Sequence, residues 1–248
     1  MALMHKACVF LAIVTILLSP FNPYKPIASG YAERYDDPIT GDYLEYWAHT
    51  PDIQTDTLVV FLHGDGEVGK MRVLENYGIV SYVKEIYGSS FPFILLVPCT
   101  RQYSWVKGTI PDTLMDLIRY VKDEYRCTNV VITGQSRGSI GTWYMAAAYP
   151  DEFVCAVPVS CPAEESDPTE IKCPVWAHQG SDDYSSKRDI DRMIEAGLNA
   201  QLTVWRGKNH ATTQKAAYNR ETFDWMLQWC VHEEPVPAWK CDLANPYL

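Results

Sequence analysis

Positive charge is scarce in this chain. Its 248 residues carry 21 Lys and Arg against 31 Asp and Glu, which gives a formal net charge of -10 at pH 7. The sequence contains no run of basic residues and no basic amphipathic helix. These are the features with which proteins neutralise a phosphate backbone or an anionic lipid surface. We therefore expect neither nucleic acid nor a membrane among the partners of the mature chain.

A hydrophobic run long enough to span a bilayer is also lacking. The apolar run Ala7–Leu18 is shorter than the roughly 20 residues that a spanning helix needs. Helix-breaking Pro20 and Pro23 follow it, and then the small residues 28–30. This order is typical of a secretory signal peptide. We expect residues 1–30 to be removed and the chain to act outside the cytoplasm, with an uncleaved anchor as the alternative.

Metal-ligand spacings are missing as well. The sequence has eight cysteines and six histidines, but no C-x-x-C or H-x-x-H pattern. We expect neither a metal nor a cofactor. Seven cysteines would remain after signal removal, and in an oxidising compartment some should pair. Cys230 and Cys241 flank a proline-containing tail and are the first pair to test, whereas Cys155 lies inside an apolar strand and is expected simply to pack there.

Strand-like and helix-like patterns alternate along the rest of the chain. The expected strands are Tyr43–Ala48, Leu58–His63, Phe93–Pro98, Asn129–Thr133, Val154–Val159, Val175–His178 and Gln201–Trp205. Between them, apolar residues recur at helical spacing, as in Leu114, Leu117, Ile118 and Val121. The alternation indicates a mostly parallel sheet flanked by helices. No repeat or linker suggests a second domain, so we expect residues 31–248 to form one domain and the protein to be a monomer.

The most informative stretch is Asn129–Gly138, which reads NVVITGQSRG. A β-branched run stops at Gly134, a G-x-S-x-G pattern centred on Ser136 follows, and a helical pattern begins near Ile140. In the strand–turn–helix context of the α/β-hydrolases, this pattern lifts the serine hydroxyl clear of the sheet at a sharp turn. The pattern alone is a weak signal, because an ordinary glycine-rich turn reads the same way. The remaining residues decide between the two interpretations.

A nucleophilic serine needs a histidine base and an orienting carboxylate. In α/β-hydrolases these residues follow in the chain order Ser, Asp or Glu, His. His210 is the histidine that follows the last expected strand, in the loop where the base belongs. Two adjacent acids, Asp182 and Asp183, follow the strand that ends at His178. In this loop of α/β-hydrolases the acid usually lies three residues after the glycine. Counting from Gly180 favours Asp183, and Asp182 stays the alternative.

An oxyanion hole needs two backbone N–H donors. One comes from the residue after the serine, here Arg137, and the other from the loop after the third strand. That loop reads His63-Gly64-Asp65-Gly66. We expect the second donor to be the N–H of Asp65, with Gly66 as the alternative. His63 is expected to hold the loop rather than to take part in the chemistry.

The sequence also predicts what surrounds this site. Only a short polar loop, from Ser160 to Pro174, occupies the place where α/β-hydrolases usually carry a lid, so we expect no lid domain and an open site. Trp105 and Tyr103 follow the strand Phe93–Pro98 and are the candidates for stacking on a substrate. Plain packing in the core is the alternative for Trp105.

Several segments together resemble one branch of the α/β-hydrolases. They are Leu58–Lys70, Phe91–Pro98, Gly134–Pro150, Val157–Ser160 and Phe223–Leu227. The combination of H-G-x-G-E, a serine elbow followed by G-T-W, and a final D-W is similar to secreted esterases described as predicted peptidases, near the polyhydroxybutyrate depolymerase-like and feruloyl-esterase-like enzymes. The resemblance covers roughly residues 43–229. That branch usually has Met and then two glycines after the serine, where this chain has Arg137, Gly138 and Ser139.

The resemblance implies a serine esterase that cleaves carboxylic esters through an acyl-enzyme outside the cell. Its substrates would be small-molecule or polymer-linked esters, such as feruloyl or acetyl groups or polyesters. A serine peptidase of the same fold is one alternative, because the branch carries that label. A non-catalytic binding module on a hydrolase fold is the alternative from another class.

Overall fold

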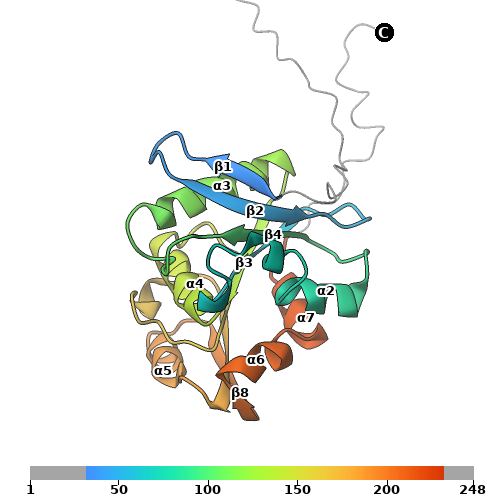
Figure 1. Cartoon of the computed structure of the whole chain (residues 1–248). Coiled ribbons are helices and arrows are strands. Elements are labelled where there is room, and N and C mark those ends of the chain that lie inside the picture. Colours follow the sequence, from blue (N-terminus) through green and yellow to red (C-terminus); the bar gives the residue numbers. More distant parts are fainter. Residues whose placement is uncertain (1–31, 232–248) are drawn as a thin grey trace, which may run out of the picture.

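A computed structural model describes residues 32–231 of the chain (Figure 1). Its strands form one eight-stranded sheet in the order β1-β2-β4-β3-β5-β6-β7-β8. The strands are β1 (Glu33–Asp36), β2 (Tyr43–His49), β3 (Thr57–Leu62), β4 (Ile94–Cys99), β5 (Asn129–Gln135), β6 (Cys155–Val159), β7 (Val175–Asp182) and β8 (Ala200–Asn209). β2 is antiparallel to both of its neighbours, β1 and β4. The remaining strands, β4-β3-β5-β6-β7-β8 in sheet order, run parallel to one another. The predicted mostly parallel sheet is confirmed.

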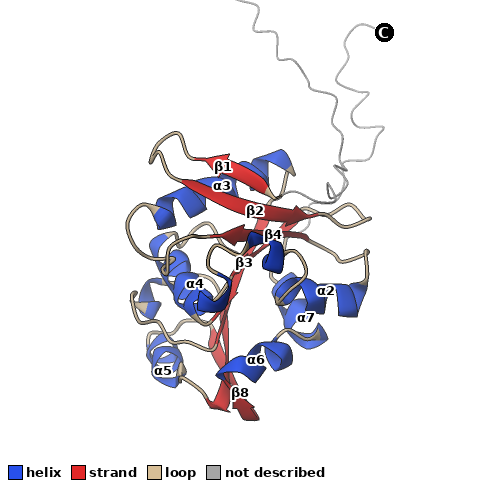
Figure 2. Cartoon of the chain, in the orientation of Figure 1, coloured by secondary structure: helices blue, strands red, loops and turns tan. Residues whose placement is uncertain are grey.

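Helices cover both faces of this sheet (Figure 2). They are α1 (Met71–Leu74), α2 (Ile79–Tyr87), α3 (Ile110–Glu124), α4 (Arg137–Ala148), α5 (Lys187–Glu195), α6 (His210–Ala217) and α7 (Arg220–Leu227), with the 3-10 turns η1 (Asp65–Glu67) and η2 (Pro168–Glu170). Side chains from α3, α4 and α5 form one buried apolar cluster with the sheet. Those of α1, α2 and α7 form a second cluster on the other face. The central strands are therefore buried on both faces, and β3 and β5 have no exposed residue.

All seven expected strands are present, and one strand was missed. β1 is four residues long, reads ERYD and is mostly exposed, so it has neither the apolar alternation nor the length that reveals a strand. β1 pairs antiparallel with β2 and forms the edge of the sheet, so its position depends on this pairing and not on its own sequence pattern. β7 and β8 run past their expected ends, because the polar residues after Gly180 and Trp205 continue the ladder between the two strands.

The segment 160–174 between β6 and β7 holds only the turn η2, so no helical cap covers the sheet edge there. The expectation of a fold without a lid is confirmed. The signal segment 1–30 lies outside the described residues. Within residues 32–231, no helix is both long enough and apolar enough to cross a membrane.

The six cysteines within the described range do not pair. Cys99, Cys127, Cys155, Cys161, Cys173 and Cys230 are all buried free thiols. Cys155 is packed in its strand as expected. The Cys230 thiol points at the Met226 carbonyl one helical turn back. Cys241 lies outside the described residues, so its pairing with Cys230 stays a prediction. Burial raises the pKa of these thiols, to about 11 for Cys99 and about 12 for Cys173, which keeps them protonated.

Candidate active site

The carboxyl edge of the parallel strands gathers the predicted site residues. Ser136 stands between β5 and α4 with φ 59° and ψ −121°, a backbone conformation that residues other than glycine rarely adopt. The flanking glycines make this turn possible. A Cβ on Gly138 would lie 1.9 Å from the Leu62 carbonyl oxygen, and one on Gly134 would lie 2.3 Å from the Gly138 carbonyl oxygen. Only glycine fits at these two positions, so the sequence pattern has a steric cause.

Ser136, His210 and Asp183 are joined by two short contacts. The Nε2 atom of His210 lies 2.8 Å from Ser136 Oγ, and its Nδ1 atom lies 2.8 Å from Asp183 Oδ1. Asp183 directly follows β7, and His210 is the first residue of α6, directly after β8. The Asp183 side chain is fully buried, whereas that of His210 is 40% exposed. A buried carboxylate therefore orients an imidazole whose other nitrogen faces an accessible serine hydroxyl.

The structure brings Asp183, and not Asp182, to the imidazole. Asp183 Oδ1 also accepts the N–H of Tyr184 at 2.8 Å, and Oδ2 lies 3.4 Å from the hydroxyl of Thr213. Asp182 is exposed, pairs with Asn209 in the ladder and accepts only a 3.3 Å contact from Ser181. Adjacent residues of an extended strand point to opposite sides, so only one of the two carboxylates can reach the base.

His210 is positioned by a helix cap. The side chain of Asn209 accepts the N–H groups of Ala211 and Thr212, and the Thr212 hydroxyl accepts the N–H of Asn209. This reciprocal capping box fixes the first turn of α6, on which His210 is the first residue. The base is therefore held at the junction of β8 and α6, not on a free loop.

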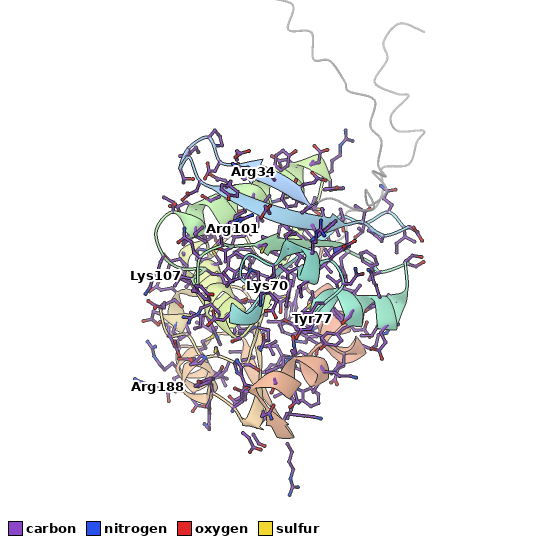
Figure 3. All side chains as sticks on the ribbon, in the orientation of Figure 1. Arg34, Lys70, Tyr77, Arg101, Lys107 and Arg188 are labelled. Atoms are coloured by element: carbon purple, nitrogen blue, oxygen red, sulfur yellow. The ribbon has the colours of Figure 1, made fainter. Side chains whose placement is uncertain are left out.

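The glycine-rich loop after β3 lies against the serine. A Cβ on Gly64 would be 3.2 Å from Ser136 Cβ, which places the next residue, Asp65, at the nucleophile. Arg137 begins α4 and Asp65 begins η1, so neither N–H has an acceptor within its own helix. Lys70, labelled in Figure 3, donates to the Gly66 carbonyl at 2.7 Å and closes the loop on itself. Both N–H groups thus belong to the first residue of a helix that starts next to Ser136.

His63 holds the start of this loop, as expected. It accepts the Thr100 N–H at Nε2 (3.2 Å), so Nδ1 carries the proton and donates to the Gly64 carbonyl at 2.7 Å. Burial lowers the pKa of His63 to about 4, and the ring is therefore neutral at pH 7. A neutral, fully bonded imidazole has a structural role in the loop.

The stacking role expected for Trp105 is wrong. Its side chain is fully buried, and a Cβ on Gly141 would come within 2.7 Å of it. Its indole N–H donates to the His63 carbonyl at 3.0 Å, and the two rings meet edge to face at 5.0 Å. Trp105 therefore fastens the strand end before the glycine-rich loop and offers no ring face to a ligand. Tyr103, from the same segment, is exposed and keeps an accessible ring.

Two features near Ser136 were missed in the sequence. Tyr184 is 62% exposed, and its ring meets that of His210 edge to face at 5.5 Å. The only signal for it was its position beside Asp183. The second is that the side chains of Arg137 and Asp65 form an ion pair, with Arg137 Nε 3.1 Å from Asp65 Oδ1. Nothing in the sequence links these residues, which are 72 positions apart. No group of three or more His, Cys, Asp or Glu side chains in residues 32–231 is arranged to hold a metal ion.

No protein-family model matches the sequence, and no curated protein matches it significantly. Solved structures do match. A thermostable esterase superposes with a TM-score of 0.65 at 24% identity over 82% of this chain, which spans 63% of that protein's length. An S-formylglutathione hydrolase from Staphylococcus aureus gives 0.62 at 17% identity, over 79% of this chain and 98% of that one. A feruloyl esterase module from Clostridium thermocellum, solved with sinapinate, gives 0.58 at 15% identity, over 83% and 90%. The chain has the α/β-hydrolase fold that these esterases share.

Proposed function

We propose that this protein is a serine esterase that cleaves carboxylic esters through an acyl-enzyme. The observation that carries the proposal is the line of contacts from Asp183 through His210 to Ser136, with 2.8 Å at both steps. The solved structures with the same fold include esterases of several kinds, which supports ester hydrolysis over other chemistry on this fold.

In the proposed mechanism each residue has one role. Asp183 accepts the Nδ1–H of His210, so Nε2 is free to take the proton of Ser136 Oγ as the oxygen attacks the ester carbonyl. The N–H groups of Arg137 and Asp65 stabilise the charge that develops on the carbonyl oxygen. The tetrahedral intermediate collapses, His210 returns its proton to the departing alcohol, and a serine ester remains. Water, deprotonated by His210, then attacks this ester. The second tetrahedral intermediate expels Ser136 Oγ, which takes the proton back from His210, and the acid is released.

Covalent labelling tests the chemistry directly. A fluorophosphonate probe should label the folded wild type, and Ser136→Ala should remain unlabelled and lose about 10⁶-fold in kcat on p-nitrophenyl acetate. Folded wild-type protein that takes up no probe would favour a non-catalytic binding module. A peptidase would be favoured if a p-nitroanilide peptide were turned over as fast as the matching p-nitrophenyl ester.

The substrate proposal rests on the openness of the site. Because no helical cap covers the edge between β6 and β7 and the His210 side chain is 40% exposed, we propose that the enzyme accepts esters attached to bulky or polymeric groups. Two of the similar structures bind the aromatic acids sinapinate and ferulate, which favours aromatic acyl groups. The net charge of -10 would repel anionic polymers, so neutral chains suit this acidic protein better.

An ester panel separates these possibilities. It would contain p-nitrophenyl acetate, methyl ferulate, acetylated xylan and a polyhydroxyalkanoate. We expect turnover of methyl ferulate and of at least one polymer. Cleavage confined to the short soluble ester would overturn the polymer proposal and leave a general carboxylesterase.

We further propose that the chain is exported and that its N-terminal segment is removed. The support is the order of apolar run, prolines and small residues within positions 7–30. Expression of the full chain in a secreting host should release a protein whose mass corresponds to loss of about 30 residues. Full-length protein retained in the membrane fraction would instead identify an anchor.

A further inference from the structure

The two residues on either side of the oxyanion position are joined to each other through their side chains. Arg137 Nε lies 3.1 Å from Asp65 Oδ1, and Arg137 Nη2 lies 3.2 Å from Asp65 Oδ2. The contact is bidentate, so it fixes the relative orientation of the two groups as well as their distance. Arg137 belongs to the serine elbow and Asp65 to the loop after β3. The ion pair is therefore a tie between two separate segments of the site.

The two segments differ in how firmly they are held. The elbow is fixed by the backbone contacts of Gly134 and Gly138, which leave no space even for a methyl group. The turn η1 that carries Asp65 has no buried residue and stands between Gly64 and Gly69. His63 and Trp105 anchor the loop at its start, and the Gly69 N–H donates to the Thr100 carbonyl at 2.9 Å at its end. Asp65 lies between these anchors, and the Arg137 guanidinium ties its side chain to the elbow.

We propose that the ion pair between Arg137 and Asp65 sets the spacing and orientation of the two oxyanion N–H groups. Both are positioning residues through their side chains, in addition to the backbone roles that the proposed esterase function gives them. The inference rests on that function.

The expected effect is on rate rather than on stability. The two side chains are 38% and 47% exposed, and exposed ion pairs contribute little to the free energy of unfolding. A catalytic group displaced by about 1 Å, however, can cost about 10²-fold in rate. The N–H groups act on charge that develops only in the transition state, so a loosened loop should lower kcat and leave KM nearly unchanged.

The experiment compares Asp65→Asn, Arg137→Met and the double variant. Asparagine keeps the shape of Asp65, and methionine keeps much of the length of Arg137 without its charge. We expect each single variant to lower kcat on p-nitrophenyl acetate by about 5–20-fold, with KM within about twofold. The inhibition constant of a trifluoromethyl ketone, which forms an oxyanion on Ser136, should rise by a similar factor. Because both changes break one tie, the double variant should be no slower than the worse single variant. Arg137→Lys keeps the charge without the bidentate contact and should fall between wild type and Arg137→Met.

A second ion pair provides the control. The Nη2 atom of Arg192 on α5 contacts both carboxylate oxygens of Asp167, at 2.9 and 3.0 Å, with 40% and 48% of the side chains exposed. Arg192→Met and Asp167→Asn remove an Arg–Asp pair of similar exposure that touches neither Ser136 nor its loop. We expect kcat and the inhibition constant of both variants to equal those of the wild type.

Three outcomes would overturn the proposal. Unchanged kcat and inhibition constants in the Asp65 and Arg137 variants would show that the tie does not position the N–H groups. A faster Asp65→Asn enzyme would show that the Arg137 charge acts directly and that Asp65 only neutralises it. Additive losses in the double variant would show two independent roles. Failure of the esterase function itself would give a different result, because the wild type would then take up no fluorophosphonate. In that case the proposed positioning role of the ion pair would also be wrong.

Discussion

At the scale of single residues, the two adjacent carboxylates at the end of β7 should differ in importance, since Asp182 is exposed and the Asp183 side chain is buried. Asp183→Asn would remove the acceptor that holds the proton on His210 Nδ1 and should cost about 10⁴-fold in kcat. Asp182→Asn changes an exposed side chain next to it and should cost less than about twofold. Initial rates on one soluble ester measure both variants. A larger loss in Asp182→Asn would reverse the assignment of the acid.

Tyr184 is the residue-scale prediction for substrate contact. Its exposed ring meets the His210 ring edge to face. We expect this ring to contact the acyl group of a bound ester. An aromatic pair contributes about 0.5–1.5 kcal/mol, so Tyr184→Ala should lower kcat/KM for methyl ferulate by about 2–10-fold more than for p-nitrophenyl acetate.

Tyr184→Phe, which keeps the ring, should behave like the wild type. Tyr120→Ala is the matched control, because this tyrosine is also partly exposed but lies on α3 beside Tyr35. If Tyr184→Ala lowered kcat/KM equally for both esters, the ring would support His210 and would not contact the acyl group.

At the scale of elements, two buried tryptophans carry the same kind of bond in different places. Trp105 donates to the His63 carbonyl and Trp143 on α4 donates to the Cys161 carbonyl, each at 3.0 Å. Trp105→Phe removes the donor to the buried His63 carbonyl, which costs about 1–3 kcal/mol. After Trp143→Phe the Cys161 carbonyl still accepts the hydroxyls of Ser139 and Ser186. Both variants also lose packing of a large buried ring, so both should lower Tm, Trp105→Phe by the larger amount.

Only Trp105→Phe should also lower kcat, because only His63 leads into the loop that carries Asp65. Thermal unfolding and ester kinetics on the two variants test this. If kcat fell equally in both, general loosening of the core would explain the effect rather than a particular hold on the loop.

The elements also show how far the sequence determines the site. The apolar strands and the order of Ser136, Asp183 and His210 were predictable. Ser136 and Asp183 follow β5 and β7, buried strands that contain apolar runs. His210 follows β8, a largely exposed strand that was expected at residues 201–205. Helix α6 was not predicted, since HATTQKAA has no apolar stripe, and its start depends on the cap at Asn209. The orientation of Trp105 was not predictable either. A tryptophan after a strand can face the site or the core, and only the fit against Gly141 decides it.

At the scale of the whole molecule, three buried histidines make stability depend on pH. Burial lowers the pKa of His49 and His63 to about 4 and that of His178 to about 3. The unfolded chain binds a proton at each near pH 6.5, so between pH 6.5 and 4 it holds more protons than the folded protein. The free energy of unfolding must therefore fall as the pH falls through this window. The loss is on the order of 3 kcal/mol for His63 alone, and the three together approach the total stability of an ordinary domain.

Thermal unfolding from pH 7.5 to 4.5 should accordingly show a steep fall in Tm below pH 6.5 and little change above it. Asp37, whose hydrogen bonds to Thr40 and the Ile39 N–H lower its pKa below 3.8, titrates beneath this window and cannot cause the fall. His49→Leu isolates one contribution, because the buried His49 Nε2 has no hydrogen-bond partner within the described residues. Its Tm should fall less steeply between pH 6.5 and 4.5 than that of the wild type. A slope identical to that of the wild type would show that His49 is already charged, or solvated, in the folded protein.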